Sequence, residues 1–520
     1  MTTFPRSLLR RAIAACATLF LSLPASAAEP PGCLYIELAK LPVRYVGLGL
    51  APAVDGIIDG TPATMLVDTG AFDTVLTMTG VARRGLGLHM TGRIAEGFGG
   101  MSRIYSTRLQ EFVIGPVKSR RSVNLGVIYE MTSPPGYDAI VGAPFLLQAD
   151  LEVDLRARQL RFFRPQNCAN VALHVWQEPT ISVPFARSFA DASPNPHFVV
   201  KVDGQEMDAL IDTGAHRSLM TKRAARRLGI DVDGPGATRL PDGGGVGSER
   251  TANWAAMVKT VEIGDEIIRD TEMRIVESQG SESADLYLGQ DFLRSHRVLF
   301  AMSQRKVYIA YLGGDVFTRG NALEPWMREE AENGNPDAQY TLAAMYTGGR
   351  GVARDAQQGR AWLEKALASG QPHASLAEGR RQLLEGHADA AIPLLRKALD
   401  QLPSERFGPL WLYTARVRNG EAALARQELE ASLKRQDRDD WPQPLARFYL
   451  GQVDAARLLD DAGRDQKTAA QRRCQANGYM AEWHAAAGDK DQAEALRATV
   501  RAQCARPAPA SAPADGAKAG

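Results

Sequence analysis

The sequence predicts a multidomain protein in which a duplicated, mostly-β region precedes an all-α array of helix pairs. A hydrophobic run that ends in Asp-Thr-Gly-Ala occurs twice, and both copies lie among short β-branched runs separated by Gly and Pro. These two observations predict the β-rich part. After Gly320 the composition changes to Ala, Leu, Arg, Glu and Gln at helical spacing, which predicts the helical part.

The duplication extends well beyond the repeated tetrapeptide. The two copies of the motif cover Leu66–Ala71 and Leu210–Ala215, a shift of 144 positions. The same shift superimposes Asp59-Gly60 on Asp203-Gly204, Thr77 on Thr221, Arg83 on Arg227 and Gly85 on Gly229. Further along, a shift of 147 superimposes the segment 138–142 on 285–289. A repeated unit of roughly 130 residues has the size of a small domain or lobe and not of a solenoid repeat.

The order of motifs in each copy resembles that of a retropepsin-type aspartic protease. Asp-Thr-Gly-Ala comes first, a Gly-rich hairpin follows, and two hydrophobic residues and a Gly come last. The resemblance covers about residues 35–314 and implies a bilobal aspartic-protease fold with both lobes in one polypeptide. It implies an aspartic-type endopeptidase in which each lobe supplies one catalytic aspartate, here Asp68 and Asp212. Two carboxylates about 3 Å apart share one proton, so that one activates water while the other acts as an acid.

The resemblance also assigns supporting roles around the two aspartates. Thr69 and Thr213 would hold the two loops together by hydrogen bonds, and Gly70 and Gly214 would let the loop backbones approach closely. Ala follows each triplet, where pepsin-like enzymes place a hydroxyl donor. One donor fewer to the ionised carboxylates predicts a higher pKa for the pair and a working pH nearer neutral.

The family covers its active site with hairpin flaps, and two Gly-rich runs are candidates for them. The candidate residues are Phe98, Gly99 and Gly100 in lobe 1 and Gly244 and Gly245 in lobe 2. Runs of Gly suit a mobile hairpin tip, although an ordinary surface loop accounts equally well for each run alone. Whether one or both act as flaps is left open.

The N-terminus has the pattern of a secretory signal peptide, residues 1–27. Arg6, Arg10 and Arg11 precede a short apolar run, and Ala25-Ser26-Ala27 supplies a small-residue cleavage site. We therefore expect an exported protein, periplasmic or secreted, without a transmembrane anchor. Removing this segment takes away three Arg and leaves the chain close to neutral, so its charge gives no reason to expect nucleic-acid binding.

Lobe 1 is predicted over residues 28–165 and lobe 2 over residues 181–314, with a Pro-containing linker at 166–180.

Outside the signal segment the chain contains Cys33, Cys168, Cys474 and Cys504, and an even number in an exported chain suggests disulfides. We favour Cys33–Cys168, which brackets lobe 1, and Cys474–Cys504, which flanks a predicted turn at Gly488-Asp489. The other pairings and four free thiols stay open.

Residues 321–505 are predicted to form helical repeats. The segment Glu332–Ala338 recurs as Ala368–Ala374 after 36 residues, and the intervening sequence is similar to a Sel-like repeat, a relative of the tetratricopeptide repeat. Each such unit is a helix pair that buries its apolar face only by stacking on its neighbours. The Pro- and Ala-rich residues 506–520 are predicted to be disordered.

Other enzyme classes lack their signatures here. The sequence contains neither Gly-x-Ser-x-Gly nor His-Glu-x-x-His, and its eight His are scattered without metal-ligand spacing. We expect no cofactor, no metal and a monomer, with a protein or peptide substrate and a possible protein partner on the repeats.

Two functional hypotheses follow. The first is an exported aspartic endopeptidase whose helical repeats recruit a protein substrate or partner. The alternative is a non-catalytic peptide-binding or scaffold protein that acts through its repeats, with the two lobes kept as a clamp. Cleavage specificity, natural substrate, propeptide processing and the partner of the repeats cannot be read from the sequence.

Overall fold

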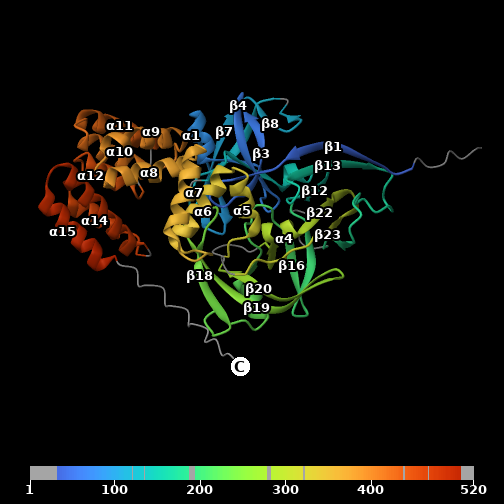
Figure 1. Cartoon of the computed structure of the whole chain (residues 1–520). Coiled ribbons are helices and arrows are strands. Elements are labelled where there is room, and N and C mark those ends of the chain that lie inside the picture. Colours follow the sequence, from blue (N-terminus) through green and yellow to red (C-terminus); the bar gives the residue numbers. More distant parts are fainter. Residues whose placement is uncertain are drawn as a thin grey trace, which may run out of the picture.

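The computed structural model describes residues 32–504 except 120, 134, 187–193, 278–282, 320–321, 437–439 and 467. The predicted signal peptide, 1–27, and the predicted disordered tail, 506–520, lie outside the described residues. Figure 1 shows two β-rich lobes on one side and a curved array of helices on the other. The fold is a mostly-β region with a separate all-α region, as the sequence predicts.

The first lobe is built on a twisted sheet whose middle strands position the first Asp-Thr-Gly. The sheet order is β6-β7-β10-β5-β11-β4-β3-β8-β9, with β2 also paired to β3. The strands are β2 (Arg44–Val46), β3 (Ala51–Ile58), β4 (Thr61–Asp68), β5 (Val75–Thr77), β6 (His89–Gly97), β7 (Gly100–Leu109), β8 (Phe112–Ile114), β9 (Val117–Lys118), β10 (Val123–Ile128) and β11 (Ala139–Gly142). Short helices α1 (Met78–Arg84) and α2 (Ala143–Leu146) follow β5 and β11.

The second lobe repeats seven of these strands, those from β6 to β3 in the order above, as β18-β19-β20-β17-β21-β16-β15. Its strands are β15 (His197–Val202), β16 (Gln205–Ile211), β17 (Leu219–Thr221), β18 (Ala237–Gly243), β19 (Thr251–Ile263), β20 (Glu266–Val276) and β21 (Leu286–Leu288). Helices α3 (Lys222–Arg227) and α4 (Gln290–Ser295) follow β17 and β21. The two lobes are therefore related by an approximate two-fold axis.

A third sheet joins the lobes, and the sequence analysis did not predict it. Its order is β1-β13-β12-β22-β23-β14, which is palindromic about the pair β12–β22. Lobe 1 supplies β1 (Leu34–Pro42), β12 (Asp150–Asp154) and β13 (Gln159–Gln166), and lobe 2 supplies β14 (Thr180–Pro184), β22 (His296–Ala301) and β23 (Lys306–Tyr311). A 3-10 turn, η2 (Met302–Gln304), connects β22 and β23. The predicted linker is not a free tether, because Cys168, Leu173 and Trp176 pack against this sheet.

Matched residues of the two lobes have the same backbone conformation and the same contacts. Asp59 and Asp203 both have φ of 47°, and the following Gly60 and Gly204 have φ of 75° and 77°. Each aspartate accepts two main-chain N–H groups from a neighbouring strand, at 2.7 and 2.8 Å. Consecutive left-handed residues form the tight hairpin turns that favour Asp-Gly. The duplication seen in the sequence is thus a duplication of structure.

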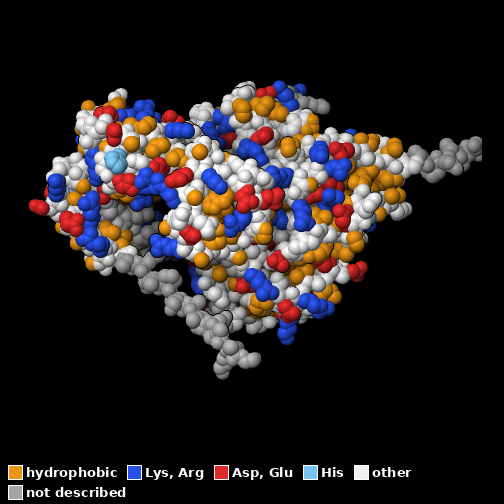
Figure 2. All heavy atoms as spheres, in the orientation of Figure 1, with side chains coloured by type: hydrophobic (Ala, Val, Ile, Leu, Met, Phe, Trp, Pro, Cys, Tyr) orange, Lys and Arg blue, Asp and Glu red, His pale blue; other side chains and the backbone are white. Residues whose placement is uncertain are grey.

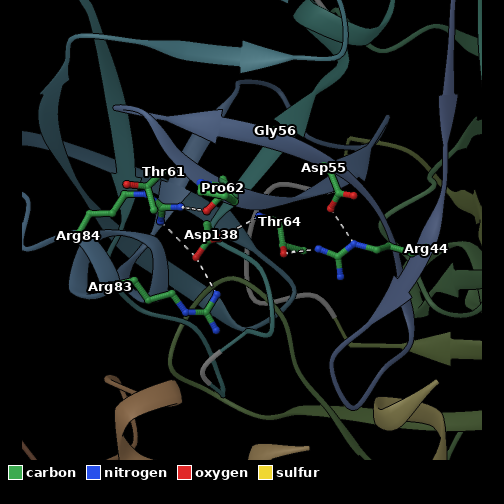
Figure 3. A pocket seen from close by; sticks show the side chains of 10 residues that line it. Arg44, Asp55, Gly56, Thr61, Pro62, Thr64, Arg83, Arg84 and Asp138 are labelled. Atoms are coloured by element: carbon green, nitrogen blue, oxygen red, sulfur yellow. Dashed lines mark hydrogen bonds and ion pairs between the residues drawn. The ribbon is translucent and has the colours of Figure 1, made fainter. Parts of the chain in front are cut away.

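An ion pair between a partly exposed arginine and a buried aspartate fixes the helix that follows each dyad loop. In lobe 1 Arg83 contacts Asp138 at 2.8 Å, and in Figure 3 Arg83 and Arg84 both point toward this carboxylate. Arg227 contacts Asp285 in the same way at 2.6 Å. Burial raises the pKa of Asp285, but the hydrogen bonds and charge of Arg227 lower it by more, so the pKa lies below its usual value. The Arg227 side chain is 42% exposed, so it forms this ion pair from the solvated face of its helix.

The structure contains both favoured disulfides, Cys33–Cys168 and Cys474–Cys504. The first joins the residue that precedes β1 to the residues that follow β13, so it secures the edge of the sheet shared by the lobes. The second joins α14 to the end of α15 across the turn at Gly488-Asp489. Both pairings are those that the sequence analysis favoured.

The helical region consists of antiparallel helix pairs stacked into an array. Its helices are α5 (Pro325–Glu332), α6 (Pro336–Gly348), α7 (Ala356–Ala368), α8 (Pro372–Leu384), α9 (Ala388–Gln401), α10 (Gly408–Arg418), α11 (Ala422–Gln436), α12 (Gln443–Tyr449), α13 (Ala455–Gly463), α14 (Ala469–Ala486) and α15 (Lys490–Gln503). The period of 36 residues has a structural basis: Asn335 caps α6 and Gln371 caps α8 through their side chains, and Pro is the first residue of both helices.

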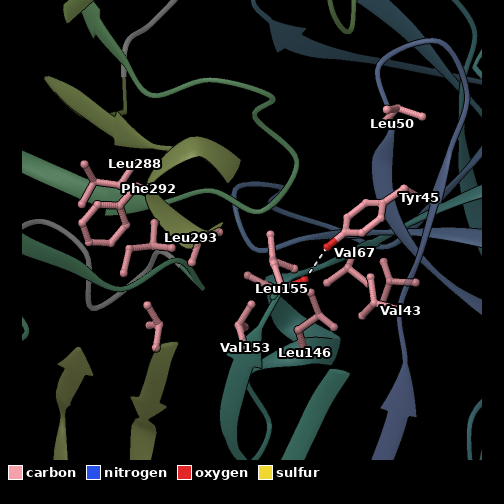
Figure 4. Packing of buried hydrophobic residues seen from close by; sticks show 14 of the residues in the cluster. Val43, Tyr45, Leu50, Val67, Leu146, Val153, Leu155, Leu288, Phe292 and Leu293 are labelled. Carbon is pink, nitrogen blue, oxygen red and sulfur yellow. Dashed lines mark hydrogen bonds between the residues drawn. The ribbon is translucent and has the colours of Figure 1, made fainter. Parts of the chain in front are cut away.

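The first helices dock on the lobes and share their core. Trp326 of α5 packs against Tyr45 of lobe 1, with 5.3 Å between ring centroids, and Arg294 of lobe 2 lies 3.1 Å from its ring centroid. Met327 and Leu342 belong to the same buried cluster as both lobes. Figure 4 shows part of that cluster, including the Tyr45 hydroxyl that donates to the Leu155 carbonyl at 2.7 Å. The end of α9 and the loop after it also contact lobe 1, because Gln401 and Ser404 bind Arg83 and Thr79 of α1. Helices α11 to α15 lie farther from the lobes (Figure 1).

Because Trp326 contacts both lobes, Trp326→Ala is expected to weaken this junction by about 3–5 kcal/mol. Calorimetry should then resolve two unfolding transitions, with the helical region separated from the lobes. Leu424→Ala on α11, where the side chain is 39% exposed, is the matched control and should change stability by less than about 0.5 kcal/mol. A single unshifted transition in Trp326→Ala would mean that the two regions still unfold together and that Trp326 does not hold the junction.

Candidate active site

The structure brings together the two aspartates that the sequence analysis singled out. Asp68 is the last residue of β4, and Asp212 directly follows β16. Each of these strands pairs in parallel with β11 or β21, the strand formed by the hydrophobic residues that lead to Gly142 or Gly289. The carboxyl ends of parallel strands meet at one edge of a sheet, so the two lobes present equivalent edges to each other at the two-fold axis.

Reciprocal hydrogen bonds between Thr69 and Thr213 hold the two loops together. The Thr69 hydroxyl donates to the Ile211 carbonyl and the Thr213 hydroxyl donates to the Val67 carbonyl, both at 2.7 Å. Each hydroxyl also accepts the main-chain N–H of the other threonine, at 2.9 and 3.1 Å. Both threonines are at most 1% exposed, so each buried hydroxyl has both a donor and an acceptor partner across the axis.

Gly70 and Gly214 are required by the close approach of the opposite carboxyl group. A Cβ on Gly70 would lie 2.4 Å from Cγ of Asp212, and one on Gly214 would lie 2.5 Å from Cγ of Asp68. Both distances are far inside van der Waals contact. The glycines therefore leave the space in which the two carboxyl groups meet.

Main-chain amides orient both carboxylates. Gly70 N–H donates to Oδ1 of Asp68 at 3.0 Å. Oδ1 of Asp212 accepts from Gly214 at 2.9 Å and from Ala215 at 3.1 Å. Asp212 thus has the larger set of donors, which favours its ionised form.

Burial raises the pKa of both aspartates, and the two groups are hydrogen-bonded to each other. For Asp68 the charge of Asp212 and the hydrogen bond to it add to burial, and the pKa lies well above its usual value. For Asp212 the amides of Gly214 and Ala215 and the hydrogen bond from Asp68 oppose the effect of burial. Because the pKa of both carboxyl groups is raised, the pair tends to retain a proton that the two aspartates share.

Two hairpins meet above the dyad loops, one from each lobe. Strands β6 and β7 form the first hairpin, with its turn at Phe98-Gly99, and β18 and β19 form the second, whose connection contains Gly244 and Gly245. Gly99 N–H donates to the Val246 carbonyl at 2.8 Å, and Glu249 N–H donates to the Gly99 carbonyl at 2.9 Å. The two tips are therefore joined by main-chain hydrogen bonds.

A third segment, after β10, binds the tip of the second hairpin from its other side. Thr132 N–H donates to the Gly245 carbonyl and Gly247 N–H donates to the Glu130 carbonyl, both at 3.0 Å. The Thr132 hydroxyl accepts Gly245 N–H at 3.0 Å. Glycine is needed at 247, because its φ is 107° and a Cβ there would lie 2.0 Å from the Gly99 carbonyl oxygen.

Two family models match the chain, one in each lobe, and one solved structure is similar to it. A crystal structure of an aspartic proteinase from Irpex lacteus is similar to the chain at 13% identity with a TM-score of 0.34, covering 52% of this chain and 97% of that one. The family model described as "gag-polyprotein putative aspartyl protease" matches residues 198–295, and the model described as "Aspartyl protease" matches residues 54–145. Each match contains one Asp-Thr-Gly. The two lobes are those of an aspartyl protease. The chain is thus an aspartic-type peptidase with a helical region attached.

Two tyrosines flank the dyad of the protease, and the sequence analysis missed both. Burial and the Asp68 charge raise the pKa of Tyr137, and burial and the Asp212 charge contribute to a raised pKa for Tyr287. They do not correspond under the lobe repeat, since Ile140 matches Tyr287. The sequence did mark Tyr287, because it lies in the repeated hydrophobic run before Gly289. That pattern does not show whether a residue lines the active site or packs in the core.

Each hairpin tip of the protease places an apolar side chain against the opposite lobe. Phe98 of the first hairpin packs edge-to-face on Tyr287 of lobe 2, with 5.2 Å between ring centroids. Val246 of the second hairpin packs in the lobe 1 cluster around Leu66 and Ile140. The space over the dyad is therefore bounded by the hairpin tips above and by two apolar clusters at the sides.

Side-chain amides complete the dyad loops and were also missed. Asn195 donates to the Thr69 carbonyl, and Gln290 Nε2 donates to the Thr213 carbonyl at 3.4 Å.

Among the residues that the structure describes, no group of three or more His, Cys, Asp or Glu is arranged to hold a metal ion. Within the same residues no helix has the length and apolar character needed to span a membrane.

The glycines of the protease give a direct test of this geometry. Gly214→Ala should force the Asp68 carboxyl out of place, and a displacement of about 1 Å lowers kcat/KM by about 100-fold. Gly87→Ala, at a position with open space around the added methyl, is the control and should leave kcat/KM unchanged. Equal activity of the two variants would refute the close approach of Gly214 to Asp68.

Proposed function

We propose that Asp68 and Asp212 are the catalytic dyad of an exported aspartic peptidase. The single observation that carries the proposal is the meeting of the two carboxyl groups, each against the glycine of the other lobe's Asp-Thr-Gly. Two buried carboxyl groups in mutual contact cannot both ionise easily, so they share one proton. Such a pair can accept and donate a proton at the same time.

The unequal surroundings of the two aspartates assign a role to each. Asp212 has the more amide donors and takes the role of the ionised base, which removes a proton from the attacking water. Asp68 holds the shared proton and hydrogen-bonds the carbonyl oxygen of the peptide. Attack gives a tetrahedral gem-diol, and proton transfer to the leaving nitrogen then breaks the C–N bond. The substrate lies between the dyad loops and the hairpin tips, which act as flaps.

Export of the chain is supported by two independent features. The first 27 residues have the pattern of a signal peptide, and the two disulfides are typical of an oxidising compartment. Figure 2 shows acidic and basic side chains mixed over the visible face of the lobes. We therefore propose a periplasmic or secreted enzyme that acts as a monomer on a peptide or protein substrate.

The helical repeats are proposed to hold a protein substrate or partner. A groove between α9, α10 and α11 supports this, because it combines apolar and charged side chains, including Leu399, Tyr413, Leu429, Arg396 and Glu428. Such mixed lining is common in surfaces that bind peptides. The alternative of a non-catalytic scaffold is less well supported, since a peptide clamp does not need two carboxyl groups in contact.

Both members of the dyad are expected to be essential. Asp68→Asn and Asp212→Asn should each lower kcat at least about 1,000-fold, since the two groups act as a unit. Asp265→Asn, at an exposed carboxylate in the turn between β19 and β20, is the matched control and should retain full activity. A diverse peptide library, with products identified by mass spectrometry, provides the assay. Full activity of either dyad variant would exclude the proposed mechanism.

The raised pKa of Asp68 predicts how pH affects stability. A carboxyl whose pKa is higher in the folded state stabilises the fold below its unfolded pKa of about 4, and this contribution is lost as pH rises through the folded pKa. Asn does not ionise, so Asp68→Asn does not lose this stability as the pH rises. The melting temperature of Asp68→Asn relative to the parent should therefore increase between pH 4 and pH 8. A difference that stays constant over this range would contradict a raised pKa.

A further inference from the structure

The two ends of the substrate path of the protease differ in how far other parts of the chain cover them. The dyad loops form the floor of this path and are related by the approximate two-fold axis that passes between Thr69 and Thr213. A two-fold axis reverses every direction perpendicular to it. The chain that follows Asp68 and the chain that follows Asp212 therefore run outward in opposite directions, and the residues four and five positions later mark opposite ends of the floor.

At the lobe 1 end these residues are accessible. They are Phe72 and Asp73, and the Phe72 side chain is 56% exposed. An apolar side chain this exposed beside the dyad loop leaves room for a substrate to continue past it. Nothing in the described part of the chain closes over Phe72.

At the lobe 2 end the matching residues, His216 and Arg217, are covered by the segment that leads into the helical region. Arg217 is 9% exposed and forms an ion pair with Glu324 at 2.9 Å, and Glu324 is the residue directly before α5. The Arg217 guanidinium also donates to the Ala322 carbonyl at 3.5 Å. Gly49 in lobe 1 lies close to the His216 ring.

The cover at this end is rigidly held, because helix α6 binds the same lobe 1 loop. Asp337 accepts Gly47 N–H at 2.7 Å, and the Thr341 hydroxyl donates to the Leu48 carbonyl at 3.2 Å. Just before α6, Asn335 donates to the Tyr45 carbonyl at 3.0 Å. Loop 47–50, residues 216–217 and the helices α5 and α6 thus converge at one point, which we name the end wall.

We propose that the end wall closes one end of the substrate path, so that the protease cuts only near one terminus of its substrate. This inference rests on the proposed function, since it concerns the path to the same dyad. It narrows the endopeptidase expected from the sequence to a peptidase that removes a short terminal segment.

The length of that segment follows from chain geometry. His216 lies four positions after Asp212, and four residues span at most about 13 Å. An extended substrate rises about 3.3 Å per residue, so at most about four residues fit between the scissile bond and the end wall. The turn after Asp212, in which Ala215 N–H donates to the Asp212 carbonyl at 3.2 Å, makes the distance shorter than this limit. The other side of the scissile bond has no such limit, because it faces Phe72 and Asp73.

The test uses the full chain and a linear peptide in which the library experiment has located the cleaved bond. Two longer peptides extend it by ten residues, one at the N-terminus and one at the C-terminus. Extension at one terminus should lower kcat/KM for the original bond at least about 100-fold, and extension at the other should change it less than about 3-fold. A head-to-tail cyclised peptide of the same sequence, which has no terminus, should resist cleavage. Asp212→Asn is run beside the parent to exclude contaminating peptidases.

Each outcome is decisive. Cleavage of both extended peptides at the original rate, or of the cyclic peptide, would overturn the end wall while leaving the dyad intact. Loss of cleavage in both extended peptides would also overturn it, because two closed ends are not what the structure has. Failure to cut any peptide would instead refute the proposed function, and this inference would fall with it.

Discussion

The reciprocal contact between Thr69 and Thr213 is the constraint on which the site depends. Neither hydroxyl can be satisfied within its own lobe, because each donates to a carbonyl of the other lobe and accepts an amide of the other threonine. A buried polar group without such a partner costs about 1–3 kcal/mol, so separation of the lobes is opposed at the same point where the carboxyl groups meet. The glycines follow from this contact, since it brings each loop backbone against the opposite carboxyl.

The shared sheet extends this constraint to the whole β-rich region. Residues of β12 and β22 pair across the axis, for example Val153 with Val298, so the lobes are joined by main-chain hydrogen bonds on the side away from the hairpins. The disulfide Cys33–Cys168 secures the edge of the same sheet. The lobes therefore behave as one body, and the helical region extends that body through Trp326 and Arg294.

The sequence was informative wherever a local pattern occurs twice. Asp59 and Asp203, Thr77 and Thr221, and the two Asp-Thr-Gly triplets could all be matched by position, and each pair has equivalent contacts. The shared sheet was not predictable, because its strands come from the ends of both lobes and pair over long sequence separations. Tyr137 and Tyr287 could not be predicted as residues beside the dyad, because neither has a tyrosine at the matching position of the other lobe. The junction at Glu324 and Trp326 was equally invisible, since nothing local distinguishes a docking helix from any other first helix of a repeat.

The joined hairpin tips have a consequence for turnover. The shared sheet joins the lobes, so a substrate that enters from the hairpin side reaches the carboxyl groups after Gly99 has separated from Val246 and Glu249. The same bonds must break again to release product. Loop motions of this kind take microseconds to milliseconds and commonly set the rate of an enzyme whose chemistry is faster. The rate at which the tips part is therefore an upper limit on kcat, whatever the peptide.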